Sequence, residues 1–390
     1  MFSPRLRNIG ESIFARMTAL ANKHNAVNLS QGFPDFSVSG TLIDLIHRHM
    51  QAGANQYAPM PGLPALRNAI SEKIRDVYGR EYNPDTSVTI TAGATQAIFT
   101  AINSIISAGD EVIVFEPAYD SYIPSILIAG GIPVPVSLNQ HNFTIDWEAV
   151  ESAVTSKTKA IVLNSPHNPC GTVFTTEDIE HLRRICSEND IYIISDEVYE
   201  HMVFDGGRHH SIAEYEDLAA KAFVISSFGK TYHATGWKVG YAAAPPELTK
   251  EFRKVHQFVT FSVHTPTQAA YAEFMQHDRS YNTLSGFYQE KRDYLNSFFA
   301  GSPLKFTPAE GTYFQIFDYS AVSDEHDLEF SERLTREAGV AVIPLSPFFS
   351  KDPDLKFIRV CFAKRDEVIK EGAERLLRYI HKDLTKDKES

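Results

Sequence analysis

The sequence predicts an α/β protein: a large domain with a mainly parallel sheet between helices, and a smaller α+β domain. Short apolar, strand-like runs alternate with helical segments from residue 88 to residue 243. This alternation is typical of a parallel sheet covered on both faces. After about residue 265 the strand-like runs become fewer and more scattered. A chain of 390 residues is long enough for two or three such domains.

The N-terminal part contains helices separated by loops. Residues 11–24 have the apolar periodicity of a helix. Residues 28–36 and 55–64 interleave apolar residues with Gly and Pro, so we expect both stretches to be loops. A further helix is predicted from residue 65 to about residue 78.

The central part contains the predicted sheet. A turn of small residues at 92–95 and a helix at 96–107 follow the first strand, and a helix at 175–189 is expected to have Thr176 as its cap. Because ligands bind beyond the carboxyl ends of parallel strands, chemistry is expected where these strands end. The seven predicted strands are residues 88–91, 112–115, 133–136, 160–163, 191–195, 222–226 and 239–243.

The C-terminal part predicts the smaller α+β domain. A long helical region at 267–299 leads into strands at 313–317, 341–344 and 357–361, and a last helix runs over 366–381. The predicted division is residues 1–40 as an N-terminal segment that joins the small domain, 41–275 as the large domain and 276–390 as the small domain.

Charge and cysteine usage limit the partners and the compartment. A formal net charge of −12 argues against nucleic acid or an anionic membrane surface as the main partner. The three cysteines, Cys170, Cys186 and Cys361, show no metal or redox spacing and are expected to pack as small apolar residues. The N-terminus lacks the apolar core of a signal peptide, and no apolar window of about 18 residues is present. We therefore expect a cytoplasmic protein with no bound metal and no membrane contact.

A turn after the first predicted strand is a candidate anion site. Residues 91–96 place Ala94 and Thr95 at the start of a helix, where free N–H groups and the helix dipole attract a phosphate. The stretch is neither a Walker motif nor a dinucleotide glycine fingerprint. Taken alone, an ordinary tight turn is the better interpretation of it.

Polar side chains follow two further strands. Residues 164–171 are a turn rich in Asn and Pro, in which the Asn168 amide can face a ligand. Asp196 closes a strongly apolar strand and should be at least partly buried, which is costly unless donors or a cation accompany it. Tyr199 follows three residues later and would project to a similar side if the chain turns helically there.

Lys230 lies just beyond the predicted strand at 222–226, after Ser226 and Ser227. A lysine near low-dielectric walls has a lowered pKa and becomes a nucleophile that can form a Schiff base. This stretch by itself is equally compatible with an ordinary exit from a strand. An anion cradle, a buried carboxylate, two donors and an amine together, however, match the needs of pyridoxal phosphate.

The sequence resembles the fold-type I aminotransferases of class I, and within them the kynurenine, glutamine and methionine aminotransferase subgroup. The bacterial methionine aminotransferases are the most similar, notably through residues 226–241 and 91–95. The resemblance spans nearly the whole chain, with the motifs in family order, and implies a seven-stranded mixed sheet. The motifs that carry it are residues 28–35, 55–57, 164–171, 195–199, 226–241 and 357–362.

The resemblance implies that the cofactor is pyridoxal 5′-phosphate. Lys230 would form the Schiff base and move the substrate proton, and Asp196 would keep the pyridine nitrogen protonated. Asn168 and Tyr199 would hydrogen-bond the ring O3′, and Tyr119 would stack on the ring.

The phosphate would be held by the backbone amides of Ala94 and Thr95 together with Ser227 and Lys238. Many relatives outside the subgroup have arginine in place of Lys238, and a lysine serves a phosphate without the bidentate fork. Tyr57 would reach the phosphate of a neighbouring subunit, so the resemblance implies a homodimer with shared active sites.

The substrate carboxylate would be gripped by Arg359, with Gly32 and Asn168 adding to its site. Phe33, Tyr57 and Phe349 are candidate lining residues for the substrate side chain, and Phe348 is a further candidate. These residues favour apolar, aromatic or thioether substrates. Core packing explains Phe348 and Phe349 equally well. No second arginine for a distal carboxylate is identifiable.

The resemblance implies a ping-pong transamination between an L-amino acid, such as methionine, glutamine, kynurenine or an aromatic amino acid, and a 2-oxo acid. A lyase that eliminates from cysteine S-conjugates is an alternative that the motifs do not exclude. A non-catalytic protein on the same fold is disfavoured because Lys230 is present. A nicotinamide dehydrogenase is disfavoured because the glycine fingerprint is absent.

Overall fold

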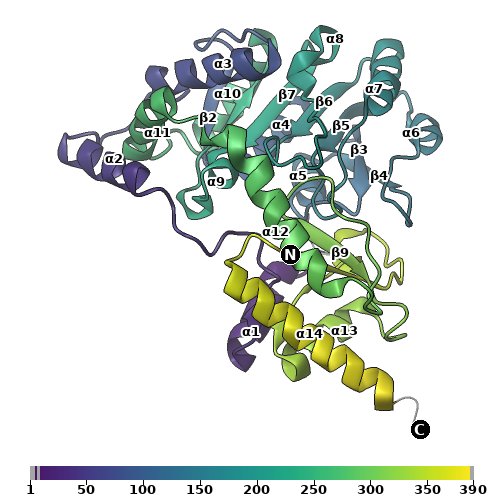
Figure 1. The fold of residues 1–390 in the computed structure, drawn as a ribbon. Coiled ribbons are helices and arrows are strands. Elements are labelled where there is room, and N and C mark those ends of the chain that lie inside the picture. Colours follow the sequence, from purple (N-terminus) through teal and green to yellow (C-terminus); the bar gives the residue numbers. More distant parts are fainter. Residues whose placement is uncertain (1–4, 7–8, 387–390) are drawn as a thin grey trace, which may run out of the picture.

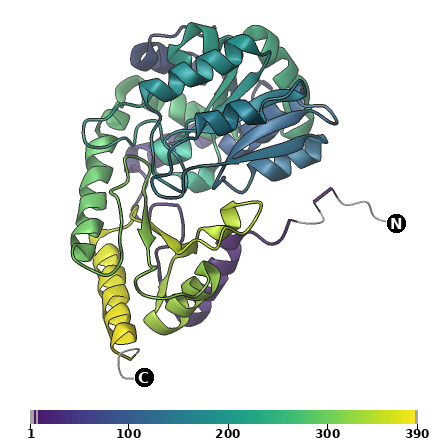
Figure 2. The same cartoon turned by 90° about the vertical axis from the view of Figure 1, so that its right-hand side faces the viewer.

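The computed structural model describes residues 5–6 and 9–386, and a seven-stranded sheet in the order β2-β8-β7-β6-β5-β3-β4 forms its centre (Figures 1 and 2). β8 is antiparallel to its neighbours β2 and β7, and the remaining neighbours are parallel. The predicted mixed, mainly parallel sheet is confirmed. The strands are β2 (Val88–Thr91), β3 (Glu111–Glu116), β4 (Ile132–Ser137), β5 (Thr158–Asn164), β6 (Tyr192–Asp196), β7 (Ala222–Ser227) and β8 (Gly240–Ala243).

The two faces of the sheet carry separate apolar cores. Successive residues of a strand point to opposite faces, so Val112 and Val114 pack into one core and Ile113 and Phe115 into the other. Burial on both faces explains why the strands are continuous apolar runs. The helices that pack on the Val112 face are α4 (Ala94–Ile105), α5 (Tyr122–Ala129) and α10 (Pro246–Val259). Those that pack on the Ile113 face are α3 (Pro64–Tyr78), α6 (Trp147–Ala153), α7 (Thr176–Glu188), α8 (Glu216–Ala219) and α11 (Thr265–His277).

Two predictions about helices are corrected. Thr175, not Thr176, caps α7: its hydroxyl accepts the Asp178 N–H at 3.1 Å, while the Asp178 carboxylate accepts the Thr175 N–H at 2.7 Å. Both threonines are good caps, but Thr175 has the extended backbone that a capping box needs. The helical region predicted at 267–299 is two helices, α11 and α12 (Leu284–Phe299), separated by a 3₁₀ turn at Ser280–Thr283.

The smaller part of the molecule joins the two ends of the chain. β1 (Val27–Asn28) pairs in parallel with β10 (Val340–Ala341). α12 runs from the sheet into this part (Figure 1), where α14 packs against it and against β1. The domain boundaries at residues 40 and 275 stay a prediction. The other elements are α1 (Ile13–His24), β9 (Phe314–Asp318), α13 (Asp327–Arg333), β11 (Ile343–Pro344), β12 (Phe357–Cys361) and α14 (Asp366–Lys386), with β11, β12 and β9 forming an antiparallel sheet.

Two further helices are α2 (Gly40–Gln51), which packs on α11, and the short α9 (Phe228–Thr231), which directly follows β7. All three cysteines are buried, as expected for packing residues. Over residues 5–6 and 9–386, no helix combines the length and the apolarity that crossing a membrane requires.

A buried ion pair joins α3 to the segment after β6. The Glu200 carboxylate accepts from Lys73 Nζ at 2.6 Å and from the Tyr78 hydroxyl at 2.6 Å, and the Ser226 hydroxyl also donates to it. Burial would raise the pKa of Glu200, but the Lys73 ammonium holds it well below its usual range. The carboxylate is therefore ionised and paired in the interior.

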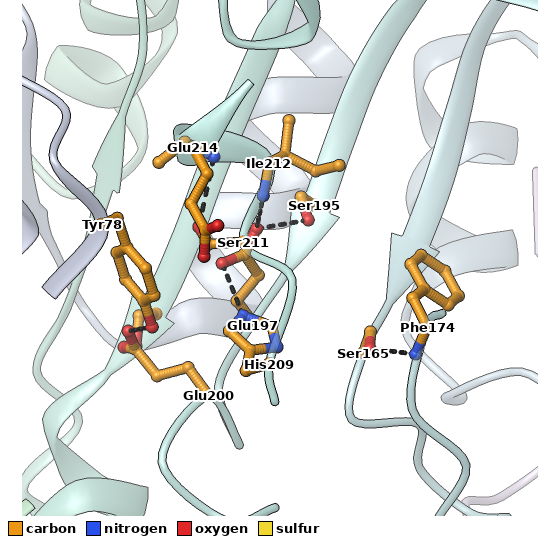
Figure 3. A network of polar contacts seen from close by, with 12 residues as sticks. Tyr78, Ser165, Phe174, Ser195, Glu197, Glu200, His209, Ser211, Ile212 and Glu214 are labelled. Carbon is orange, nitrogen blue, oxygen red and sulfur yellow. Dashed lines mark hydrogen bonds and ion pairs between the residues drawn. The ribbon is translucent and has the colours of Figure 1, made fainter. Parts of the chain in front are cut away.

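Glu197 forms a second anchor on the same segment. Figure 3 shows its carboxylate between Ser195, His209 and the backbone of Ile212. It accepts from the Ser195 hydroxyl at 2.8 Å and from the Ile212 N–H at 3.0 Å, and it lies 3.0 Å from His209 Nε2. With Glu200, it fixes the segment that also carries Asp196.

We predict that Lys73→Met lowers the free energy of unfolding by about 3–5 kcal/mol, because it leaves the Glu200 carboxylate buried without a cation. Denaturation by urea measures the change. The matched control is Lys254→Met, which breaks an exposed pair with Glu251 and should cost less than about 1 kcal/mol. Equal effects of the two substitutions would contradict a stabilising role of the buried pair.

Candidate active site

A cavity of about 390 Å³ lies at the carboxyl edge of the sheet. It brings together all of the predicted site residues except Tyr57, Phe349 and the further candidate Phe348. The predicted residues that line it are Gly32, Phe33, Ala94, Thr95, Tyr119, Asn168, Asp196, Tyr199, Ser227, Lys230, Lys238 and Arg359.

The ends of β5 and β6 form the floor of the site. Asn164 and Asp196 are paired in the strand register, and Asn164 Nδ2 donates to the Asp196 backbone carbonyl at 2.9 Å. Asn164 Oδ1 accepts the Asn168 N–H at 2.8 Å. Asn164 thus holds the turn after β5 against the end of β6. This contact places Asn168 beside the strand that ends with Asp196.

The Asp196 carboxylate is buried and has a phenol as its main partner. The Tyr122 hydroxyl donates to Oδ2 at 2.6 Å, and the Val198 N–H approaches Oδ1 at 3.4 Å. Burial raises the pKa of Asp196 to about 6, while the Tyr122 hydrogen bond and the nearby Lys230 charge oppose the rise. A buried carboxylate whose hydrogen-bond donors are neutral, as Tyr122 and the Val198 N–H are, is suited to pair with a cationic ring nitrogen.

The Lys230 amine reaches from the end of β7 to the smaller part of the molecule. Its Nζ donates to the Tyr313 hydroxyl at 2.7 Å and to the Gly32 carbonyl at 3.1 Å. Burial lowers the pKa of Lys230 to about 8, and the charges of Arg359 and Lys238 add to the lowering. A fraction of the amine is therefore neutral near physiological pH, as a nucleophile or base requires.

The N-terminus of α4 forms a cradle for an anion. No side chain caps this helix, whose first residues are Ala94 and Thr95, so its first N–H groups lack intrahelical partners. Lys238 lies beside Gly93, the residue just before the helix: a Cβ added to Gly93 would stand 3.3 Å from Lys238 Nζ. Gly93 also has a positive φ, of +78°. Ser227 also lines this end of the cavity. Free amides, a helix dipole and a lysine suit a phosphate.

Arg359 is a buried cation with neutral partners. Its Nη1 donates to Asn168 Oδ1 at 2.6 Å and its Nη2 to the Ser30 carbonyl at 3.2 Å, while its buried Nε has no partner within the part of the chain that the structure describes. The guanidinium stacks 3.8 Å from the centre of the Phe314 ring. Burial lowers the pKa of Arg359. A buried guanidinium with neutral partners is well suited to a carboxylate ligand.

Two tyrosines line the cavity as neutral donors. Burial raises the pKa of both Tyr119 and Tyr199, so their hydroxyls keep their protons. The Tyr199 ring packs edge-on against Tyr313 at 5.1 Å between centroids. The Tyr119 ring packs in the same manner against Tyr122 at 5.7 Å.

Tyr57 and Phe349 lie away from this cavity. Tyr57 is 83% exposed and contacts the Phe261 ring at 5.5 Å between centroids. Phe349 is partly buried and packs against the core on the Ile113 face, and its neighbour Phe348 is buried in that core. For Phe348 the structure supports the packing interpretation.

Sequence reasoning missed Tyr122 and Tyr313, the partners of Asp196 and Lys230. Tyr122 follows Tyr119 by three residues, at the start of a helix after a strand, and this spacing was the available signal. Tyr313 stands directly before β9 and is 83 residues from Lys230. A contact at such separation leaves no local pattern in the sequence.

The chain matches the family described as aminotransferase class I and II over residues 24–376. This match covers most of the chain, and the fold and the lysine-containing cavity agree with it. The chain belongs to this family and is an aminotransferase, as the sequence predicted.

The similarity extends to individual relatives. The chain is 46% identical to methionine aminotransferase of Escherichia coli, over 95% of this chain and 97% of the relative. It is 34% identical to human kynurenine–oxoglutarate transaminase 1, over 96% and 97% of the two chains. The structure of YbdL from Escherichia coli, for which a methionine aminotransferase function was identified, superposes with a TM-score of 0.94 at 45% identity, over 97% and 99% of the chains.

The ionisation of Asp196 gives a testable pH dependence of stability. Because the folded carboxyl keeps its proton up to about pH 6, and an unfolded one only to about pH 4, the folded state loses stability as the pH rises between these values. We predict that the ligand-free protein loses about 3 kcal/mol relative to Asp196→Asn across this range. Urea denaturation at a series of pH values measures the difference.

Tyr122→Phe sharpens this test. It removes a donor to the ionised carboxylate, which raises the pKa of Asp196 further, so the loss of stability should extend above pH 6. An unchanged pH dependence in Tyr122→Phe would show that the phenol does not stabilise the carboxylate.

Proposed function

We propose that this aminotransferase uses pyridoxal 5′-phosphate to exchange amino groups between an L-amino acid with an apolar, thioether or aromatic side chain and a 2-oxo acid. The observation that carries the proposal is the buried Lys230 amine, whose pKa is lowered to about 8, in one cavity with Asp196 and Arg359. An amine, a buried carboxylate and a buried guanidinium are the groups that this chemistry needs.

The residues of the cavity fit the cofactor. The N-terminus of α4, with Ser227 and Lys238, suits the phosphate, and Asp196 suits the pyridine nitrogen. Asn168 and Tyr199 suit the ring O3′. When bound, pyridoxal 5′-phosphate supplies an aldehyde that carries the amino group and an electron sink for the substrate carbanion.

The protein supplies positioning and proton transfer. Neutral Lys230 Nζ takes the proton from the substrate Cα, a step that a positioned base accelerates by about 10²–10⁴-fold. Ionised Asp196 keeps the ring nitrogen protonated. Arg359 holds the substrate carboxylate, and Asn168 fixes the guanidinium through its 2.6 Å hydrogen bond.

The proposed substrate class follows from the remaining lining. Phe14, Phe33 and Phe314 supply apolar surface. The cations that line the cavity in the described part of this chain are Lys230, Lys238 and Arg359, and each has a task above. A distal carboxylate thus finds no further cation from this chain, which favours methionine, glutamine, kynurenine or aromatic amino acids over aspartate. The names of two relatives, methionine aminotransferase and kynurenine–oxoglutarate transaminase 1, support this choice.

We infer a homodimer with shared active sites. Tyr57 is 83% exposed, Phe258 is 84% exposed and Phe261 is 47% exposed, and exposed aromatic groups of this kind suit a second copy of the chain. Tyr57 would then reach the phosphate site of the partner subunit. A cytoplasmic location stays a prediction.

A half-reaction tests the function. Enzyme loaded with pyridoxal 5′-phosphate should convert the cofactor to pyridoxamine 5′-phosphate when mixed with methionine, glutamine or kynurenine alone, as followed by absorbance. Lys230→Ala should abolish turnover, and wild-type turnover in this variant would overturn the mechanism. Release of pyruvate and ammonia from a cysteine S-conjugate, without conversion of the cofactor, would support the lyase alternative instead.

We predict that Arg359→Lys raises the KM for the amino acid about 10–100-fold, because an ammonium cannot replace the bidentate contact with the carboxylate. Cofactor affinity should stay within about twofold, because no cofactor contact is assigned to this side chain. Steady-state kinetics and cofactor titration measure the two effects. Arg365→Lys, at an exposed arginine outside the cavity, is the matched control and should leave both values unchanged.

A further inference from the structure

The Tyr313 hydroxyl and the Lys230 amine form a set of hydrogen bonds with one backbone carbonyl, and Tyr313 also interacts with the Tyr199 side chain. Lys230 Nζ donates to Tyr313 Oη at 2.7 Å and to Gly32 O at 3.1 Å, and Tyr313 Oη donates to Gly32 O at 2.6 Å. Each of the three polar groups thus contacts the other two. The Tyr313 ring is fully buried.

The protonation states in this set follow from burial. Burial raises the pKa of Tyr313, so the phenol stays protonated and its O–H donates a hydrogen bond to Gly32 O. Its oxygen lone pairs remain for the lysine. A protonated Lys230 amine therefore finds two hydrogen-bond acceptors for its N–H groups. A neutral amine has fewer N–H groups and needs fewer acceptors. The arrangement favours the amine that has just taken up a proton.

The three groups come from separate parts of the chain. Lys230 follows β7 of the large sheet, Tyr313 precedes β9 and Gly32 lies in the loop after β1. A Cβ on residue 32 would stand 2.8 Å from the Phe314 ring, so the close approach of this loop needs glycine. The amine is consequently held across the boundary between the two parts of the molecule.

Simple packing of a buried tyrosine does not explain the contact. Tyr288 is equally buried, its ring centre lies 5.6 Å from that of Tyr313, and its hydroxyl has no hydrogen-bond partner among the described residues. A tyrosine in this core can therefore be present without a polar partner. The hydroxyl of Tyr313 is the one directed at the reactive amine.

We propose that Tyr313 is a further catalytic residue, whose hydroxyl forms with the Gly32 carbonyl a holding site for the Lys230 amine whenever that amine carries the substrate proton. The inference rests on the proposed function of Lys230 as the base. The Cα–H bond breaks, its proton forms an N–H bond on Nζ, and the ammonium donates to Tyr313 Oη and Gly32 O. The Lys230 ammonium then transfers this proton to the carbon atom that accepts it in the second step. Tyr313 keeps its own proton throughout.

The first test titrates the amine in the protein without cofactor. Acetylation of Lys230 is followed by peptide mass spectrometry over a pH series, with exposed Lys351 as the internal reference. Tyr313→Phe removes an acceptor of the ammonium, so the pH midpoint of Lys230 reactivity should fall by about one unit. Tyr288→Phe, which removes the hydroxyl of the neighbouring tyrosine, should leave the pH midpoint of Lys230 reactivity at the wild-type value.

The second test uses the loaded enzyme. Tyr313→Phe should lower kcat by about tenfold or more and move the rising limb of the kcat–pH profile to lower pH. The KM for the amino acid should stay within about twofold, because the hydrogen bonds that hold the Arg359 guanidinium come from Asn168 and Ser30. Tyr313→Met also lacks the hydroxyl and should show the same shifts, and it replaces Tyr313→Phe if that variant does not fold.

The result that overturns the proposal is a Lys230 midpoint in Tyr313→Phe or Tyr313→Met equal to those of the wild type and Tyr288→Phe. Failure of the proposed function gives a different pattern. In that case the wild type would not transaminate, yet the midpoint in the cofactor-free protein would still shift with loss of the Tyr313 hydroxyl.

Discussion

The active site depends on the parallel pairing of β5, β6 and β7. The carboxyl ends of parallel strands lie along one edge of a sheet. The register pairs Asn164 with Asp196 and Asp196 with Ile225. It therefore also brings the turn after β5 close to α9, the helix after β7 that carries Lys230. A slip of one residue would reverse the face of every side chain in a strand. The apolar cores on both faces prevent such a slip.

Burial at this edge sets the chemistry of the charged groups. It raises the pKa of Asp196 to about 6 and lowers that of Lys230 to about 8, so near neutral pH the carboxylate is ionised while part of the amine is neutral. Removing charged groups from water is costly unless partners compensate. Tyr122 provides this for Asp196, and the pair of Glu200 with Lys73 anchors the same segment from the other side.

The smaller part of the molecule completes the site. Arg359 comes from β12, Tyr313 from the residue before β9, and Gly32 from the loop after β1, whereas Lys230 and Asp196 come from the large sheet. The hydrogen bond from Arg359 to Asn168 crosses between the two parts at 2.6 Å. The proposed carboxylate binding and the proposed proton transfer therefore both require the two parts to lie against each other, which would link substrate binding to their relative position.

The sequence by itself determined the alternation of strands and helices, the burial of Asp196 and the position of Lys230 at a strand exit, because these follow from local periodicity and turn chemistry. Motifs in family order led to the predicted roles of Arg359 and Lys238, which stay predictions. Only the tertiary structure decided that Tyr122 contacts Asp196, that Tyr313 contacts Lys230, and that Phe349 lies outside the cavity. Such contacts join residues far apart in the chain, and side-chain packing in three dimensions selects them without leaving a local pattern.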